Sequence, residues 1–424
     1  MGTTLIDGKG LRRVVITGLG LVSPLGIGAK DSWDAAKAGT STAAVIRQFD
    51  PTECDTHFAC EVPEGFDIEQ FLDRKTARRM DRFSHLGVAA AMLGYEDSGI
   101  KGTVTPDRMG VIIGSGIGGI QTWHEQTVRL RDLGPTRLSP LFIPTIIANM
   151  GAAQASMEIG LQGPLSCSTT ACASANHAIG DAFDHIRLGR ADAMLAGGTE
   201  GAVALVGIAG FNAMKALSTR NDDPGTASRP FDIGRDGFVM GEAGAVLVLE
   251  ELGHALDRGA DIICELAGYG LSGDAHHITE PDPTAVGPAL AMTMALADAG
   301  LESSEVDYVN AHGTSTPVGD PSEIRVIRRA LGEEKAAATM VSSTKSMHGH
   351  TLGAAGGLEA ALTALAVRDG IVPPTINVTE LDPECAGVDH VLDVAREADV
   401  RVALSNVFGF GGHNATLAFR RMED

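Results

Sequence analysis

The sequence has no apolar run long enough to cross a membrane. Its longest apolar stretches, such as "GAVLVLE", have the length of a β-strand, whereas a spanning helix needs about 20 residues. The opening "MGTTLI" shows neither a signal-peptide pattern nor the Ser or Thr that N-myristoylation requires. We therefore expect no membrane segment and no targeting leader.

The cysteines form no CxxC pair and no metal-binding spacing. A disulfide framework or a zinc site would place them at short, regular intervals. We therefore expect no metal and a reducing, cytoplasmic location. The six residues are Cys54, Cys60, Cys167, Cys172, Cys264 and Cys385.

Basic residues are scarce: 33 Lys and Arg stand against 54 Asp and Glu, a formal charge of −21. Nucleic-acid binding depends on neutralising phosphates with Lys and Arg, so we expect no nucleic-acid partner. One segment, "DRKTARRMDR", runs against this balance with Arg74, Lys75, Arg78, Arg79 and Arg82. From the residues alone it is either a solvated helix face or a docking site.

The chain of 424 residues is rich in glycine and apolar residues, with 53 Gly and 44% hydrophobic residues. Strand-like segments, each close to a glycine, alternate with helix-like segments. This alternation predicts an α/β protein with a mostly parallel sheet covered on both faces. The strand-like segments are "RRVVITGLG", "RMGVIIGSG", "ADAMLAGGT" and "GAVLVLEEL", and two helical segments are "FSHLGVAAAMLGYEDSG" and "GPALAMTMALADAGL".

A weak internal repeat divides the chain near residue 260. "CSTTACASANHAIGDAFDHIRLGRADAML" resembles "SSTKSMHGHTLGAAGGLEAALTALAVRDGIVPP", since both pass from a Ser-Thr turn into an alanine-rich helix. "VVITGLGLVSPLG" and "ELAGYGLSGD" open the two parts in a similar way. We therefore predict two duplicated α/β halves, residues 1–260 and 261–424.

Cys172 lies at the start of a predicted amphipathic helix. Unpaired N–H groups and the positive end of the helix dipole favour a thiolate there, so the pattern predicts a lowered pKa and a nucleophilic cysteine. The small neighbours leave room for a substrate carbonyl, although a free cysteine is also a common inert core residue. Apolar residues that define the helix face recur at Ala175, Ala178, Ile179, Ala182, Phe183 and Ile186.

Three further segments carry reactive residue types in loops. "NAHGTSTPVGD" contains His312, "STKSMHGHTLGAAGG" contains Lys345 and His350, and "SNVFGFGGHN" contains Phe410 in a glycine-rich bend. Active-site groups of α/β proteins gather in loops of this kind, although a single histidine in a Gly/Thr loop is more often a structural, hydrogen-bonding residue. "GSGIGG" follows a strand, but without an acidic second strand it indicates tight backbone packing rather than a dinucleotide site.

The four segments, in this order, resemble the elongating, Cys-His-His type of β-ketoacyl-acyl-carrier-protein synthase. The resemblance extends from "RRVVITGLGLVSPLG" through "SRPFDIGRDGFVMGEAGAVLVLE" to "GGHNATLAF". It implies the thiolase fold, a five-layered α-β-α-β-α sandwich of two duplicated halves, and a homodimer. It also implies a decarboxylating Claisen condensation in fatty-acid elongation, without a cofactor, on substrates carried by acyl carrier protein.

The resemblance also assigns roles. Cys172 would accept the acyl group, while the N–H groups of Cys172 and Phe410 would hold the oxyanion. His312 and His350 would stabilise the enolate as neutral N–H donors, and Lys345 would lower their pKa. These residues form the implied catalytic group.

Further positions match the family with supporting roles. Thr314 and Thr316 match positions that hold the pantetheine arm, and Phe410 matches the gate of the acyl pocket. Asp274 and His277 match a loop that moves with the gate. The remaining matches are Glu359, expected to orient the lysine, and Asp320, expected to be a structural hydrogen-bonding residue.

An acidic carrier protein would need a local positive patch on an enzyme of charge −21. The resemblance places Arg74, Lys75, Arg78 and Arg79 there, with Arg137 and Lys215 as additions. His348 in "KSMHGH" departs from the family, which more often has a small residue.

Four other classes of protein share some of these sequence features. A ketosynthase subunit of a type II aromatic polyketide synthase shares all four motifs. A degradative thiolase would need a second cysteine in the C-terminal glycine-rich loop, and "FGFGGHN" has none. A non-catalytic chain-length subunit would lack Cys172, and an NAD enzyme rests only on "GSGIGG".

Overall fold

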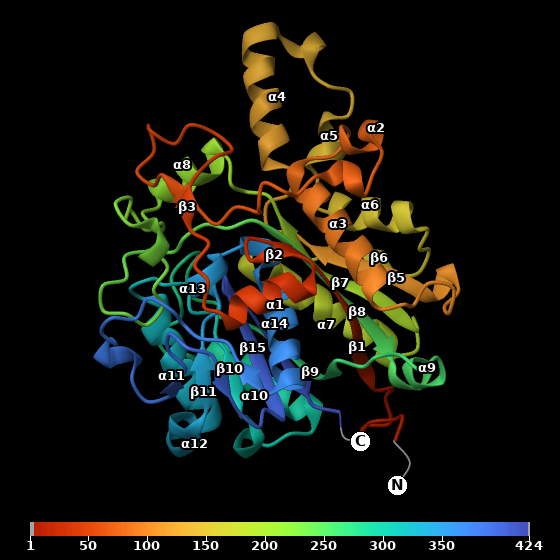
Figure 1. The fold of residues 1–424 in the computed structure, drawn as a ribbon, viewed down its shortest axis with the longest axis vertical. Helices are drawn as coiled ribbons and strands as arrows, with labels where there is room; N and C mark the ends of the chain where they lie inside the picture. Colours follow the sequence, from red (N-terminus) through yellow and green to blue (C-terminus); the bar gives the residue numbers. More distant parts are fainter. Residues whose placement is uncertain (1–3, 423–424) are drawn as a thin grey trace.

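The computed structural model describes residues 4–422, and its strands form two groups with the same topology (Figure 1). In each group the sheet order, counted along the chain, is first, fifth, fourth, second, third. The first group is β1 (Val14–Ser23), β5 (Met109–Gly114), β6 (Leu165–Ser166), β7 (Ala193–Glu200) and β8 (Ala243–Glu251). The second group is β9 (Cys264–Gly273), β10 (Tyr308–Asn310), β11 (Met340–Ser342), β15 (Val402–Gly409) and β16 (His413–Arg420).

The two groups join through β1 and β9, which pair antiparallel over Val14–Ile16 and Cys264–Leu266. In both groups the first strand pairs antiparallel with the fifth, and the fifth antiparallel with the fourth; the remaining two pairings are parallel. Within each group, four of the five strands therefore run in the same direction and only the fifth runs opposite, so the mostly parallel sheet predicted from the sequence is present in both halves. β16 follows β15 through a short glycine turn, and such a hairpin reverses the chain direction.

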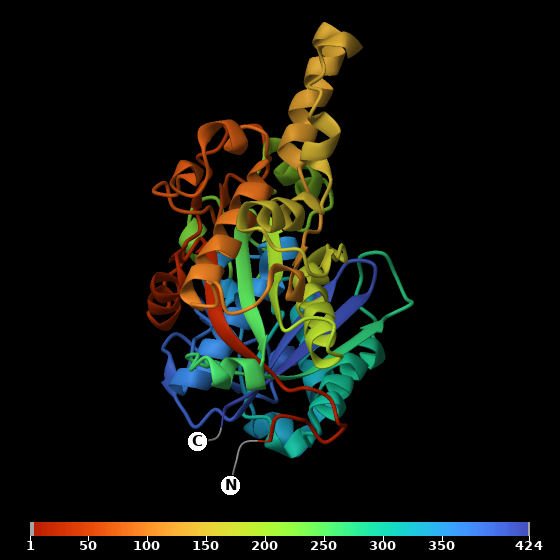
Figure 2. The same ribbon diagram turned by 90° about the vertical axis from the view of Figure 1, so that its right-hand side faces the viewer.

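Helices separate and cover the two groups of strands in five layers (Figures 1 and 2). One core cluster fills the space around the two inner helices and contacts the inner faces of both groups. Two further clusters lie under the outer helices, one on each outer face. The inner helices are α7 (Ser174–Arg187) and α14 (Ala355–Asp369), and the outer ones are α3 (Arg82–Asp97), α6 (Met150–Ile159), α10 (Val286–Ala299) and α11 (Gly319–Leu331).

Glycines in the first strand of each half explain the similar openings of the halves. A Cβ added at Gly20 in β1 would lie 1.8 Å from the Ala90 carbonyl oxygen of α3. A Cβ at Gly270 in β9 would lie 2.0 Å from the Ala291 oxygen of α10. Because only glycine permits this approach, both outer helices pack directly on the strand backbone. The repeat predicted from "GLGLVSPLG" and "AGYGLSGD" therefore has a structural basis.

The inner helices also begin alike. A 3₁₀ turn, η4 (Ala171–Ala173), leads into α7, and another, η7 (Leu352–Ala354), leads into α14. The first residue of each turn has a left-handed backbone, with φ of 51° at Ala171 and 49° at Leu352. A non-glycine residue in this region is uncommon and strained, so the same strained bend has been duplicated.

An arm of two helices, α4 (Ile120–Leu133) and α5 (Phe142–Ile146), projects from the body (Figures 1 and 2). Of the helices in residues 4–422, none is both long enough and apolar enough to span a bilayer. The other helices are α1 (Ala29–Lys37), α2 (Arg74–Ala77), α8 (Leu205–Ala213), α9 (Leu252–Asp257), α12 (Glu333–Ala338) and α13 (Lys345–His348), and short strands are β2 (Gly26–Ile27), β3 (Ala44–Val45), β4 (Phe58–Ala59), β12 (Ile371–Val372), β13 (Asp389–His390) and β14 (Arg396–Glu397).

Candidate active site

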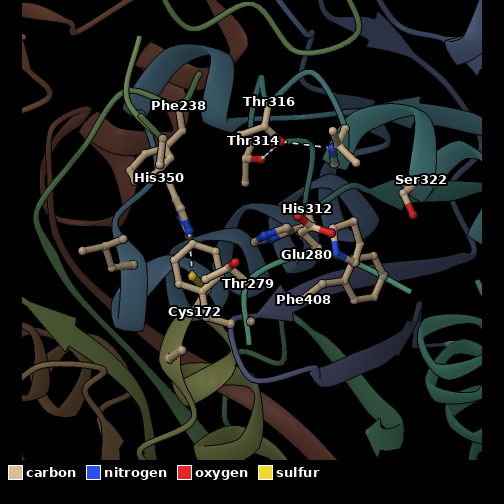
Figure 3. A pocket seen from close by; sticks show the side chains of 18 of the residues that line it. Cys172, Phe238, Thr279, Glu280, His312, Thr314, Thr316, Ser322, His350 and Phe408 are labelled. Carbon is tan, nitrogen blue, oxygen red and sulfur yellow. Dashed lines mark hydrogen bonds between the residues drawn. The ribbon is translucent and has the colours of Figure 1, made fainter. Parts of the chain in front are cut away.

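A cavity of about 700 Å³ is lined by residues from both halves of the protein. Cys172 reaches it from the first half, and His312, His350 and Phe410 reach it from the second (Figure 3). The structure thus brings together four residues that the sequence places up to 238 positions apart. Apolar side chains supply most of the remaining wall, among them Phe211, Phe238, Leu352 and Phe408.

Cys172 is the second residue of η4, the turn that leads directly into α7. It therefore lies at the start of a helix, as the sequence predicted. The turn is closed by Ser174, whose hydroxyl donates to the Ala171 carbonyl at 2.6 Å and accepts from the Thr170 N–H at 2.9 Å. The thiol is 8% exposed and faces the cavity. A strained bend therefore presents Cys172 to the cavity, with the partly buried Ala171 beside it and Ala173 buried behind it.

The lowered pKa predicted for Cys172 is wrong. Burial raises the pKa of the thiol to about 12, although the Lys345 ammonium and the backbone N–H groups of Phe410 and Cys172 act in the opposite direction. Loss of hydration outweighs the helix-start effect at this depth. The resting group is a thiol, so its proton must be removed as it reacts.

His350 is placed to take that proton. Its Nε2 lies 3.0 Å from the Cys172 Sγ (Figure 3). The His350 backbone forms an isolated β-bridge with the segment before β8, because its N–H donates to the Val239 carbonyl at 2.7 Å and its carbonyl accepts from the Gly241 N–H at 2.9 Å. Sulfur and imidazole therefore form a contact pair on a rigid frame.

His312 follows β10 and completes the group. Its ring centroid lies 5.3 Å from that of His350, with the ring planes at 89°. Burial first, and then the charge of Lys345, hold the pKa of both imidazoles well below the usual value. The family resemblance implied that the charge of Lys345 lowers the pKa of both histidines. The structure shows that burial lowers it more than Lys345 does. Both rings are neutral near pH 7.

Lys345 and Glu359 form an ion pair beneath the histidines, and both are buried. Lys345 begins α13, and Glu359 lies in α14. Burial raises the pKa of Glu359 to about 7, while the lysine opposes that shift. The contact expected between these residues is therefore present.

Thr314 and Thr316 line the cavity on the loop after His312 (Figure 3). Their hydroxyl oxygens are 3.1 Å apart, and Thr316 also accepts from the Gly319 N–H at 3.2 Å. The pair offers hydroxyl groups to a polar chain that passes along this wall.

Phe410 lies in the turn between β15 and β16, followed by Gly411 and Gly412 with φ of 84° and 74°. Such φ values favour glycine. The turn is bonded to the loop after β9: the Asp274 N–H donates to the Gly412 carbonyl at 3.0 Å, and the Gly411 N–H donates to the Ile278 carbonyl at 2.8 Å. The two loops expected to act together are therefore in direct contact.

Of the three residues expected to form the gate and its loop, Phe410 and Asp274 line the cavity and His277 does not. It is exposed, and its Nδ1 accepts from the N–H groups of Thr279 and Glu280 within its own loop. Thr279 and Glu280 line the cavity in its place. The ring therefore shapes the loop rather than facing the cavity.

Asp320 joins two strained backbone positions. It accepts from the N–H groups of Phe231 at 2.8 Å and Ser315 at 3.1 Å, whose φ values are 70° and 69°. Burial raises the pKa of Asp320 to about 6. Its contacts are those of the structural hydrogen-bonding residue that was expected.

The sequence reasoning missed two buried carboxylates that line the cavity. Glu323 accepts from the N–H groups of His312 at 2.8 Å and Gly313 at 2.6 Å. Its position three residues after Asp320 on α11 places it on the same helix face, a signal that was available. The second, Glu200, ends β7 in the segment "GGTE".

His348, the departure from the family pattern, is buried beside Thr344, whose hydroxyl lies 3.1 Å from its Nε2. Burial, together with Lys345, lowers the pKa of His348 to about 3. It is not among the residues that line the cavity. An uncharged ring at this position leaves the cavity polarity unchanged.

The residues of the predicted patch lie on the surface. Arg74 and Lys75 in α2, with Arg78 and Arg79 directly after it, are all exposed, as are Arg137 and Lys215. Lys215 also lines the cavity mouth. We call these six residues the basic patch.

Comparison with known proteins places the chain in one family. The Beta-ketoacyl synthase N-terminal domain matches residues 11–255, and the C-terminal domain of the same family matches residues 263–379. The 3-oxoacyl-[acyl-carrier-protein] synthase 2 of Synechocystis sp. is 48% identical over 413 residues, 97% of this chain and 99% of the relative.

Solved structures agree with this match. A beta-ketoacyl synthase from Burkholderia phymatum STM815 superimposes with a TM-score of 0.90 at 39% identity, over 97% of this chain and 100% of that one. A type II polyketide ketosynthase solved with its acyl-carrier protein gives a TM-score of 0.90 at 31% identity over the same shares. The expected thiolase fold is confirmed. The chain belongs to the β-ketoacyl synthase family.

Proposed function

We propose that this protein lengthens an acyl chain by decarboxylating Claisen condensation with malonyl-acyl-carrier protein, as a fatty-acid elongation ketosynthase. The observation that carries the proposal is the contact of the Cys172 thiol with a neutral His350, beside a neutral His312, in a cavity of about 700 Å³. The name of the 48% identical relative supports the elongation reaction over the polyketide alternative, since the type II polyketide ketosynthase described above is 31% identical.

In the first half-reaction the Cys172 sulfur attacks the thioester carbonyl of an acyl-carrier protein. His350 Nε2 takes the thiol proton as the S–C bond forms, and the proton then passes to the departing pantetheine sulfur. The N–H groups of Cys172 and Phe410 hold the oxyanion of the tetrahedral intermediate. The product is acyl-Cys172 and a free carrier thiol.

In the second half-reaction malonyl-carrier protein loses CO₂, and the electron pair of the broken C–C bond forms a thioester enolate. His312 donates an N–H hydrogen bond to the enolate oxygen. His350 donates a second one after its ring proton has moved from Nδ1 to Nε2 through water, because Nε2 is left without a proton when the first half-reaction ends. The enolate carbon attacks acyl-Cys172, and the thiolate leaves and regains a proton. No metal, nicotinamide or flavin enters this scheme.

The remaining residues hold the substrates. Thr314 and Thr316 bind the pantetheine arm, and Phe410 gates the acyl pocket together with the loop at Asp274. Glu359 orients Lys345, whose charge, together with burial, keeps the histidines neutral.

The test is an assay of the wild-type chain with acyl- and malonyl-carrier protein. Mass spectrometry should find a 3-oxoacyl product two carbons longer, and absence of that product would contradict the proposal.

The basic patch receives the acidic carrier protein. Arg74, Lys75, Arg78 and Arg79 of the patch are exposed. Lys215 lies both in the patch and at the cavity mouth, which suits delivery of a pantetheine arm.

Arg78→Glu combined with Arg79→Glu should raise the KM for acyl-carrier protein about tenfold while kcat stays near the wild-type value, because like charges on enzyme and carrier weaken docking. Steady-state kinetics at low salt measure the effect.

Two comparisons control this experiment. Arg401→Glu reverses an equally exposed charge outside the patch and should leave the KM unchanged. An acyl-pantetheine substrate without the carrier protein should be used equally well by wild type and patch variant. A patch variant with an unchanged KM for acyl-carrier protein would contradict the assignment.

The protein assembles as a homodimer. The edge strand β6 is exposed, with Leu165 at 50%, and the arm exposes apolar side chains, including Trp123 at 47% and Ile143 at 59%. An open strand edge and an exposed apolar arm on the same chain suit a symmetric partner copy. Light scattering at about 10 μM should give twice the chain mass of 43.9 kDa; the mass of a single chain would contradict it.

The division into halves at residues 1–260 and 261–424 follows the strand groups, since α9 ends at Asp257 and β9 begins at Cys264. The cytoplasm is the proposed location, because the thiols, including the catalytic one, require a reducing compartment.

A further inference from the structure

Glu200 ends β7 inside the cavity wall, fully buried, and its carboxylate is held by uncharged donors. Within residues 4–422 no Lys, Arg or His forms an ion pair with it. The donors are Gly116 N–H at 2.8 Å and Gly353 N–H at 3.0 Å to Oε2, with Ser115 Oγ at 3.0 Å and Ile117 N–H at 3.3 Å to Oε1. The glycine-rich segment "GSGIGG" therefore directs two of its N–H groups, those of Gly116 and Ile117, at a protein carboxylate.

These donors come from opposite halves of the molecule. Ser115–Ile117 follows β5 in the first half, whereas Gly353 lies in η7, three residues after His350, in the second. The first-half loop also packs on the nucleophile turn, since a Cβ at Gly116 would lie 3.3 Å from the Ala171 carbonyl oxygen. One carboxylate thus joins the segment behind Cys172 to the segment that carries His350.

The space at this junction admits no side chain. A Cβ at Gly353 would lie 2.3 Å from the Gly116 nitrogen and 2.5 Å from Glu200 Oε2. The backbone of Gly353 in η7 is therefore in direct contact with the backbone of Gly116 in the loop after β5. Only glycine at position 353 allows this contact.

The bend duplicated in η4 and η7 explains why the Gly353 N–H needs a hydrogen-bond acceptor within the protein. Gly353 is the second residue of η7, as Cys172 is of η4. In the proposed mechanism the Cys172 N–H serves the reacting oxyanion, while the equivalent N–H in the second half is occupied permanently by Glu200. The same backbone feature acts once on the substrate and once on a protein carboxylate.

We propose that Glu200 is a positioning residue for condensation: its carboxylate clamps the His350 turn to the nucleophile turn and so keeps His350 Nε2 at 3.0 Å from Cys172 Sγ. This inference rests on the proposed function. Glu200 acts through its hydrogen-bond acceptors on Gly116 and Gly353. The clamp therefore sets the rate of chemistry and leaves carrier docking and pantetheine binding unaffected.

The test compares three variants in the condensation assay. Glu200→Met keeps the side-chain length but removes every acceptor, and should lower kcat about 10- to 100-fold, the effect of leaving buried N–H groups without partners. KM for both carrier-protein substrates should stay within about twofold. Glu200→Gln can direct its carbonyl oxygen at Gly116 and Gly353, and should restore kcat to within about threefold of wild type.

Gly353→Ala separates the turns without changing Glu200 and should reproduce the loss in kcat. Combined with Glu200→Met it should cost little more than either change alone, because both break one link. Gly210→Ala, in open space on α8, is the matched glycine control and should leave kcat unchanged. If Glu200→Met fails to fold, Gly353→Ala and Glu200→Gln carry the test.

A wild-type kcat in Glu200→Met or Gly353→Ala, a rise in KM alone, or a Glu200→Gln variant as impaired as Glu200→Met would overturn the inference. Any of these results with an active wild-type protein leaves the proposed function intact. A wild-type protein that forms no 3-oxoacyl product would overturn both.

Discussion

Cys172→Ala is expected to abolish condensation, with a loss of at least about 10⁴-fold in product formation. The sulfur is the atom that the cavity places next to His350, at 3.0 Å from Nε2, and in the proposed mechanism it holds the acyl chain while the second substrate enters. Without it no covalent intermediate forms. Mass spectrometry should find no acyl adduct on the variant after incubation with acyl-carrier protein.

The same variant should still decarboxylate malonyl-carrier protein, because the enolate is stabilised by the histidines and not by the thiol. Cys167→Ala is the matched control: Cys167 lies five residues upstream, contacts Thr169 and does not line the cavity. It should condense at the wild-type rate. Persistent 3-oxoacyl product from Cys172→Ala would refute the assignment of the nucleophile.

His312→Ala and His350→Ala are expected to separate the two half-reactions. Each should accept an acyl group on Cys172 yet decarboxylate malonyl-carrier protein about 10²- to 10³-fold more slowly, the cost of removing one donor from a developing oxyanion. Both rings are neutral donors because burial and Lys345 hold the pKa of each well below its usual value. Acyl-adduct mass and CO₂ release measure the two steps.

The contact geometry predicts a difference between the two variants. His350 Nε2 lies 3.0 Å from the Cys172 sulfur, whereas His312 makes its ring contact with His350, so His350→Ala should also slow acylation. His276→Ala, an exposed histidine of the loop after β9, should alter neither step. If neither cavity variant forms an acyl adduct, the proposed division of labour is wrong.

Much of the fold was predictable because the repeated pattern is local. Strands at Val14–Ser23 and Ala243–Glu251 follow from short apolar runs bounded by turns, and the helix at Ser174–Arg187 follows from its apolar face. That the glycines of "GLG" and "GYG" lie where an outer helix meets a strand came only from the structure. The mostly parallel direction was predicted, whereas the one opposed strand in each half was not, because its direction depends on which edge of the sheet the chain returns to.

The sequence predicted which residues belong to the candidate site. It did not predict their orientation, their hydrogen-bond partners or their burial. Cys172, His312 and His350 lie in recognisable segments, yet His277 proved to face away from the cavity. Glu200 gave no sequence signal beyond a carboxylate at a strand end, because its partners lie 84 and 153 residues away.

By itself, the sequence determined the order of elements and the duplication, since these depend on residue type, periodicity and turn chemistry along short stretches. The roles proposed for Cys172, His312 and His350 came from the resemblance of four ordered motifs to a known family. Only the tertiary structure decided that the thiol is protonated, that the imidazoles are neutral and that one buried carboxylate joins the two halves. The physical reason is desolvation: how far water is excluded from a group depends on segments hundreds of residues apart, and that exclusion raises the pKa of Cys172 to about 12.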